Sequence, residues 1–183
     1  MARVLVPLAQ GCEELEAVTI VDLLRRAGIE VVTAGLDAQP VRAARGTVLM
    51  PDTTLDAALN TDYDMIVLPG GLPGADHLRD DPRIIDLVRR MHEADRYTAA
   101  ICAAPRVLAK AGLLDNRRAT SYPGSIDVGA IPGIDYVEDA VVTDGKVVTS
   151  RGPGTAMDFA LELVGLLAGQ AKRDEVEASL QRP

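Results

Sequence analysis

Thr98-Ala99-Ala100-Ile101-Cys102-Ala103-Ala104-Pro105 is the stretch that decides the fold class of this 183-residue chain. The small and apolar residues 98–101 predict a short buried strand, and residues 103–112 predict a helix. Cys102 therefore falls on the turn between them, as the nucleophile does in the nucleophile elbow of hydrolases. Because a helix start favours a thiolate, we expect Cys102 to be reactive, with a depressed pKa, rather than an inert buried side chain.

The same alternation of apolar strands and amphipathic helices continues along the chain. We predict strands at 3–8, 30–34, 65–68 and 119–120, helices at 14–27, 54–59, 82–94, 155–167 and 172–180, and hairpins within 40–51 and 136–149. In the first helix, Leu15, Val18, Val21, Leu23 and Leu24 follow helical spacing and should face the core. This pattern predicts one α/β domain over residues 1–183, a mostly parallel sheet with helices on both faces.

Composition limits the classes of partner. The formal net charge is −8 and there is no basic tract, which argues against nucleic acid. No apolar run is long enough for a bilayer, and the N-terminal residues form a strand instead of a signal peptide, so we expect no membrane partner and a cytoplasmic location. Cys12 and Cys102 are too few for a disulfide framework and lack metal-ligand spacing, and no dinucleotide fingerprint is present.

Candidate site residues follow three of the predicted strands. Ligands of such sheets bind beyond the carboxyl ends of the strands, where residues 11–16, 70–71 and 102 should meet. Glu16 could donate a hydrogen bond to a Cys102 thiolate, or act as a general acid and base. Gly70 and Gly71 expose backbone N–H groups, and those of Gly71 and Ala103 could bind an oxyanion.

The two histidines give little support for a Cys-His dyad. We place His92 on a solvated helix face. His77 follows Gly71 at loop distance and could in principle reach the site, but the interpretation that it lies elsewhere is favoured.

Four motifs in this order resemble the ThiJ/PfpI superfamily, within it the branch of the Parkinson-disease-associated protein deglycase and its bacterial relatives. They are Gly11-Cys12-Glu13-Glu14-Leu15-Glu16, Leu68-Pro69-Gly70-Gly71, Ala100-Ile101-Cys102-Ala103-Ala104-Pro105 and Ser150-Arg151-Gly152-Pro153-Gly154-Thr155. The resemblance covers residues 4–167 and implies a flavodoxin-like sandwich and a homodimer. It also implies an oxidation-prone nucleophile at Cys102, a protonated carboxyl at Glu16, and oxyanion donors at Gly71 and Ala103.

The resemblance further implies an activity without a cofactor. It is a glyoxalase III-like conversion of methylglyoxal or glyoxal, or deglycation of early protein adducts, and a redox-sensing and chaperone role is also implied. Arg26, Arg45 and Arg151 match arginines that the family places near the dimer interface and the active-site entrance. Where several members carry a histidine before a proline, this chain has Tyr122, a much weaker base near neutral pH. Cys12 stands where many relatives have a small residue, and is either a buried small side chain or a resolving cysteine for Cys102.

These patterns leave three hypotheses for the function. In the leading one, Cys102 attacks the carbon of an aldehyde, Gly71 and Ala103 hold the oxyanion, and Glu16 transfers the proton. The alternative is a non-enzymatic sensor whose output is the oxidation of Cys102. An intracellular peptidase of the same superfamily is less favoured, because Cys102 has no clear histidine partner.

Overall fold

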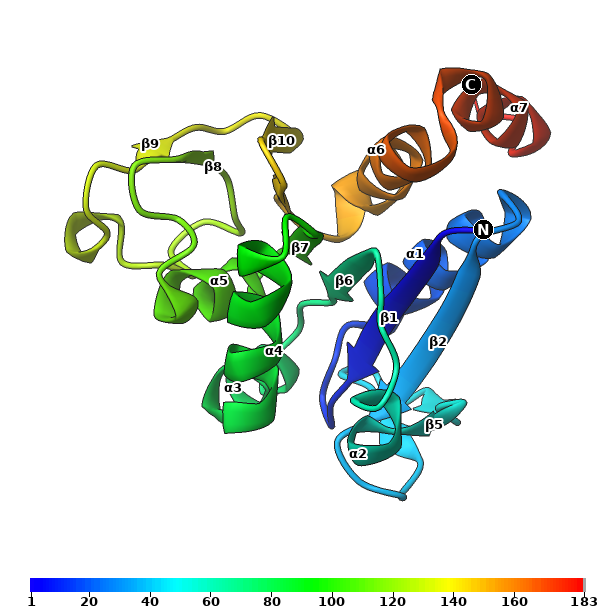
Figure 1. The fold of residues 1–183 in the computed structure, drawn as a ribbon, viewed down its shortest axis with the longest axis horizontal. Coiled ribbons are helices and arrows are strands. Elements are labelled where there is room, and N and C mark those ends of the chain that lie inside the picture. Colours follow the sequence, from blue (N-terminus) through cyan, green and yellow to red (C-terminus); the bar gives the residue numbers. More distant parts are fainter. Residues whose placement is uncertain (183) are drawn as a thin grey trace.

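A seven-stranded sheet forms the centre of the computed structural model, which describes residues 1–182 (Figure 1). Its strands run in the order β10 (Val141–Asp144), β11 (Val147–Ser150), β7 (Tyr97–Ile101), β6 (Met65–Leu68), β1 (Arg3–Leu8), β2 (Glu30–Gly35) and β5 (Thr53–Thr54). Neighbouring strands are parallel except for the β10–β11 hairpin. The prediction of a mostly parallel sheet is therefore confirmed.

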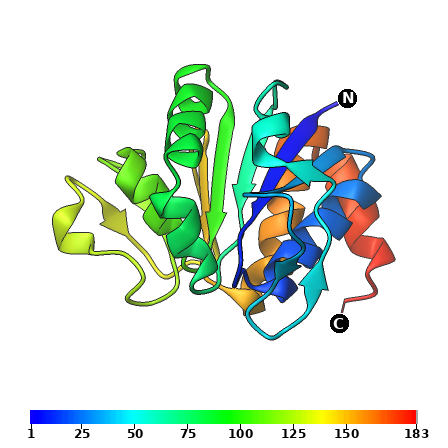
Figure 2. The same ribbon diagram turned by 90° about the horizontal axis from the view of Figure 1, so that it is seen from below.

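Helices cover both faces of this sheet, as Figure 2 shows. They are α1 (Glu14–Arg26), α2 (Leu55–Ala58), α3 (Gly74–Asp80), α4 (Pro82–Glu93), α5 (Pro105–Ala111), α6 (Ala156–Ala168) and α7 (Gln170–Ser179). Successive side chains of a strand point to opposite faces, so Val4 and Val6 pack with α1, α6 and α7, whereas Leu5 packs with α2, α4 and α5. None of the helices within residues 1–182 combines the length and apolar composition that crossing a bilayer requires.

Two short strand pairs lie outside the main sheet. The expected hairpin within residues 40–51 is present as β3 (Val41–Arg42) and β4 (Val48–Leu49). The second expected hairpin is correct only from residue 141 onward. Tyr136 belongs instead to β9 (Asp135–Tyr136), which pairs in parallel with β8 (Arg118–Ala119).

The orientation of α1 corrects one prediction. Leu15 and Val18 were expected in the core, but each is 50% exposed. The buried side of the helix carries Glu16, Ala17 and Ile20 instead. Helical spacing identifies an apolar stripe but cannot decide between solvent and core at its edges, so the carboxyl of Glu16 enters the interior while two apolar side chains remain outside.

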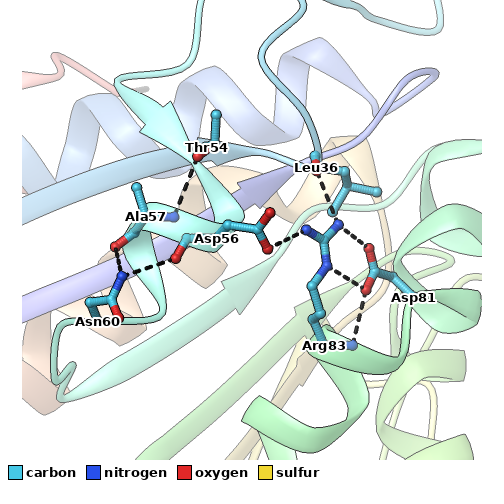
Figure 3. A network of polar contacts seen from close by, with 7 residues as sticks. All are labelled: Leu36, Thr54, Asp56, Ala57, Asn60, Asp81 and Arg83. Carbon is cyan, nitrogen blue, oxygen red and sulfur yellow. Dashed lines mark hydrogen bonds and ion pairs between the residues drawn. The ribbon is translucent and has the colours of Figure 1, made fainter.

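An arginine joins three segments next to the carboxyl ends of β2 and β5 (Figure 3). At the start of α4, the Arg83 guanidinium pairs with Asp56 at 2.7 Å and with Asp81 at 2.6 Å, and donates to the carbonyl oxygen of Leu36 at 3.0 Å. Asp81 also caps α4 by accepting from the Arg83 N–H. These contacts fix the position of α4 against the end of β2 and against α2.

Candidate functional site

Cys102 lies on a sharp turn between β7 and α5, as predicted. Its φ is +63°, in the left-handed region that residues other than glycine seldom adopt. The Cys102 N–H donates to the carbonyl of Ser150 at 2.9 Å, which continues the pairing of β7 with β11 into the turn. The helix begins at Pro105 and not at Ala103, so residues 102–104, called the Cys102 turn below, lie outside regular structure.

Glu16 reaches this turn from the buried side of α1. Its side chain is fully buried, and Oε2 accepts a hydrogen bond from the Gly70 N–H at 2.8 Å. Its other oxygen, Oε1, has no hydrogen-bond partner among residues 1–182. Burial raises the pKa of Glu16 to about 7, although the Gly70 N–H and the Cys102 thiol lower it. The carboxyl therefore keeps its proton up to nearly neutral pH.

The titration of Cys102 departs from the prediction. Burial and the charge of Glu16 together raise the pKa of this thiol to about 12, against the Gly71 and Ala103 N–H groups, which lower it. The expected depressed pKa is therefore wrong for this resting site, because lost hydration outweighs the two N–H groups. The contribution of Glu16 requires the ionised carboxylate. Protonation of Glu16 removes it, so thiol and carboxyl titrate as a coupled pair.

Both predicted oxyanion donors face the sulfur. The N–H groups of Gly71 and Ala103 come from two different loops, and both lower the pKa of the Cys102 thiol. The loop after β6 can approach this closely only without a side chain at Gly70. A Cβ there would lie 2.6 Å from the Cys102 Cβ and 2.8 Å from Glu16 Oε2.

A pocket of about 450 Å³ opens onto these groups and is called the Cys102 pocket below. Its wall includes Gly71, Cys102, Ala103 and the half-exposed ring of Tyr122. Its volume is in the range of small-molecule sites. Within residues 1–182, no group of three or more His, Cys, Asp or Glu side chains is arranged to hold a metal ion.

Neither histidine lies in the wall of the Cys102 pocket. His77 borders a separate hollow of about 680 Å³, in the wall of which Gln10 and Arg83 also lie. His92 is half-buried near the end of α4, and its Nδ1 has no hydrogen-bond partner among residues 1–182, so the expected solvated position is only partly correct.

Of the three arginines singled out by resemblance, only Arg45 lines the Cys102 pocket. Its backbone N–H donates to Glu14 at 3.0 Å, which fixes the β3–β4 hairpin against the start of α1. Arg151 follows β11, is mostly buried, and lies outside the pocket wall. Arg26 is the last residue of α1, pairs with Asp22 at 2.7 Å and does not line the Cys102 pocket, and its place at a dimer interface stays a prediction.

Cys12 is a free thiol just before α1 and is only 1% exposed. Burial raises the pKa of Cys12 to about 12. Unlike Cys102, it does not line the Cys102 pocket. Cys12 is therefore the less accessible of the two thiols, and its role as a resolving cysteine stays a prediction.

Two residues that the sequence patterns did not single out also contact the Cys102 turn. The Ser125 hydroxyl donates to the carbonyl of Cys102 at 3.2 Å, and Arg106 Nε donates to the carbonyl of Ala103 at 3.0 Å. The segment between β8 and β9, which carries Ser125, lies beside α5 in Figures 1 and 2. That segment has no periodic pattern, so the sequence held no signal for this contact.

Comparison with known proteins gives a consistent result. The sequence pattern described as the DJ-1/PfpI family matches residues 2–166. The chain is 44% identical over 178 residues to Protein dj-1beta of Drosophila melanogaster, covering 96% of this chain and 95% of that protein. It is 36% identical over 175 residues to a Caenorhabditis elegans protein named glutathione-independent glyoxalase DJR-1.2, covering 96% and 92%. The crystal structure of Drosophila melanogaster DJ-1beta matches with a TM-score of 0.93 at 41% identity, covering 100% of this chain and 98% of that one.

Proposed function

Because the chain belongs to the DJ-1/PfpI family, we propose that it is a cofactor-independent cysteine enzyme of the glyoxalase III or deglycase type. The observation that carries this proposal is the wall of one pocket, which holds the Cys102 thiol and the Gly71 and Ala103 residues whose N–H groups act on it. Behind that wall lies the fully buried Glu16 carboxyl, which has a pKa of about 7. A relative named as a glutathione-independent glyoxalase supports the same class of activity. The substrates would be methylglyoxal, glyoxal or their early adducts on proteins.

The proposed reaction needs no external oxidant. The Cys102 sulfur bonds to the aldehyde carbon, and the carbonyl oxygen takes up the displaced electron pair and a proton, held by the Gly71 and Ala103 N–H groups. The hydrogen on that carbon then leaves as a proton and the neighbouring carbonyl carbon gains one, while the hydroxyl proton moves to the neighbouring oxygen. The first carbon is thereby oxidised to a thioester and the second is reduced to an alcohol. Water finally cleaves the thioester, which releases a 2-hydroxy acid and the thiol.

Glu16 is the group available for these proton transfers. A general acid and base works best when its pKa is near the working pH, and burial brings the pKa of Glu16 to about 7. Tyr122 lies in the pocket wall at the position where the family resemblance implies a histidine in several members, and a phenol is a far weaker base than an imidazole near pH 7. We therefore assign both proton transfers to Glu16.

We also propose that the active form is a homodimer. Leu15 and Val18 on α1 are each 50% exposed, and Met50, beyond β4, is 74% exposed. Leu15 and Val18 are three residues apart and so lie on one face of α1, and an exposed apolar face can mark a contact with a partner. Sedimentation should give a dimer for the natural chain and a monomer for Val18→Glu, whereas a natural chain that sediments as a monomer contradicts this proposal.

Lactate formation from methylglyoxal tests the enzymatic proposal. The natural chain should produce lactate, Cys102→Ser should produce none, and Glu16→Gln should lose about 100-fold or more of the rate. Cys12→Ala serves as the control and should retain the rate of the natural chain. Lactate formation by Cys102→Ser at the natural rate would exclude the thiol from the reaction.

A redox sensor is the second candidate, favoured by the absence of a histidine from the wall of the Cys102 pocket. Its output would be oxidation of Cys102 without turnover. Gain of oxygen mass on Cys102 under mild peroxide, in a chain that forms no lactate, would support the sensor over the enzyme.

A further inference from the structure

The carbonyl oxygens of Cys102 and Ala103 are both held by side chains. Ser125 Oγ donates to the Cys102 carbonyl at 3.2 Å, and the Tyr122 N–H donates to the same oxygen at 2.8 Å. Arg106 Nε donates to the next carbonyl, that of Ala103, at 3.0 Å. Both residues line the Cys102 pocket, but neither hydrogen-bonds to the sulfur itself, so their hydrogen bonds act on the thiol through the backbone of the turn.

The planarity of the peptide group provides that route. In the trans amide that joins Cys102 to Ala103, the carbonyl and the N–H point in opposite directions. Holding the Cys102 carbonyl therefore sets the direction of the Ala103 N–H, one of the two donors that face the sulfur. A hydrogen bond to the carbonyl also polarises the amide and makes its N–H a stronger donor.

Arg106 links the Cys102 turn to the loop that carries the other donor. Its Nη1 pairs with Asp76 at 2.6 Å, and the Arg106 side chain is only 17% exposed. Asp76 belongs to α3, which begins three residues after Gly71. Arg79 also pairs with Asp76, at 2.9 Å, but its other hydrogen bonds go to Asp80 and none goes to the turn.

We propose that Ser125 and Arg106 are positioning residues of the Cys102 site. Ser125 holds the amide that carries the Ala103 N–H, and Arg106 holds the next amide, so the two peptide planes on either side of Ala103 keep that N–H directed at the sulfur. Their effect on turnover rests on the proposed function. Their effect on the thiol does not, because the Ala103 N–H lowers the pKa of Cys102 whatever the substrate is.

Alkylation of Cys102 by iodoacetamide across a range of pH measures the thiol directly. In Ser125→Ala and in Arg106→Ala, the Cys102 alkylation rate at pH 8 should fall by about threefold to tenfold, the effect of one hydrogen bond. The rise of the alkylation rate with pH should move to higher pH, because a thiolate that loses a donor is harder to form. Ser125→Thr retains the hydroxyl and should restore the profile of the natural chain.

Two variants serve as matched controls. Ser121→Ala removes another hydroxyl of the same segment, which contacts the carbonyl of Tyr122 and the phenol of Tyr136 but not the Cys102 turn. Arg79→Ala removes the second arginine from Asp76. Both controls should keep the natural alkylation profile, whatever they do to the melting temperature.

A Ser125→Ala variant with the natural alkylation profile would overturn the proposal for Ser125, and so would a Ser121→Ala variant that shifts the profile equally. If Arg106→Ala does not fold, Arg106→Lys provides the test. It keeps the charge but not the Nε position, and should show the same upward shift.

In the methylglyoxal assay, the Ser125 and Arg106 variants should lose kcat with little change in KM. If the natural chain forms no lactate, the proposed function fails, while the alkylation profiles still decide the positioning role.

Discussion

Replacing Glu16 by glutamine should make the protein more stable at pH 8 than the natural chain. Burial raises the pKa of Glu16 from 4.5 to about 7. Between these values the folded chain holds a proton that the unfolded chain has released, so the free energy of unfolding falls as the pH rises. At about 1.4 kcal/mol per pH unit, the loss amounts to about 3 kcal/mol once Glu16 is ionised. The side chain is fully buried, so solvent does little to screen this penalty.

Glutamine is a close structural match that cannot ionise. Its side-chain oxygen can accept from the Gly70 N–H as Glu16 Oε2 does, at 2.8 Å in the natural chain. The stabilisation of Glu16→Gln should therefore approach about 3 kcal/mol at pH 8, or about 6 to 12 °C in melting temperature for a chain of this size. It should shrink toward zero near pH 5, where Glu16 itself is protonated in the folded state.

The measurement is thermal and urea unfolding between pH 5 and pH 8.5. Both chains carry Cys102→Ser, so that the coupled thiol does not titrate. Glu14→Gln is the control. Slight burial raises the pKa of Glu14, but backbone N–H groups at the helix start and of Arg45 lower it by more. The stabilisation that Glu14 gives the folded chain is therefore lost as the pH falls. Parallel curves for Glu16→Gln and its parent would show that Glu16 holds no proton above its ordinary pKa.

Three further outcomes follow from the site geometry. Gly70→Ala should lower stability by about 1 to 3 kcal/mol in thermal unfolding, because the new Cβ would lie 2.6 Å from the Cys102 Cβ. Gly154→Ala, where a Cβ meets nothing within 4 Å, should leave stability nearly unchanged. Equal losses of stability in the two variants would contradict a steric cause at Gly70. Brief iodoacetamide treatment followed by peptide mass spectrometry should label Cys102 before Cys12, since only Cys102 lines the pocket, and the reverse order would refute it. Mild peroxide should add two oxygens to Cys102 as a sulfinate, whereas loss of two hydrogens, abolished in Cys12→Ala, would reveal a disulfide.

The sequence predicts an element well where its apolar residues are frequent and periodic. Ile84, Ile85, Leu87 and Val88 identify α4 to within a residue, and the whole of β6 is apolar. The sequence holds no signal for α3, because Gly74–Asp80 offers only two apolar side chains, too few to show a period. Helical spacing also failed at the edge of α1, where Leu15 turned out to be half exposed.

The site could be predicted where backbone order alone determines it. Cys102, Gly71 and Glu16 follow successive parallel strands, and such strands end at one edge of the sheet. The pKa of the thiol could not be predicted, because it depends on how deeply the turn is buried, and burial follows from the packing of the whole chain. Ser125 and Arg106 contact the turn through single side chains outside any motif, so only the three-dimensional structure reveals them.

The left-handed backbone of Cys102 means that a mutation which stabilises the fold can remove the reactive thiol. A residue with a Cβ at a φ of +63° costs the fold roughly 1 to 2 kcal/mol, a cost that glycine escapes. A library screened only for heat resistance, yield or protease survival would therefore enrich Cys102→Gly. The selected variants would have the same fold and higher stability but no thiol. Directed evolution of this protein therefore needs an assay of Cys102 reactivity in every round.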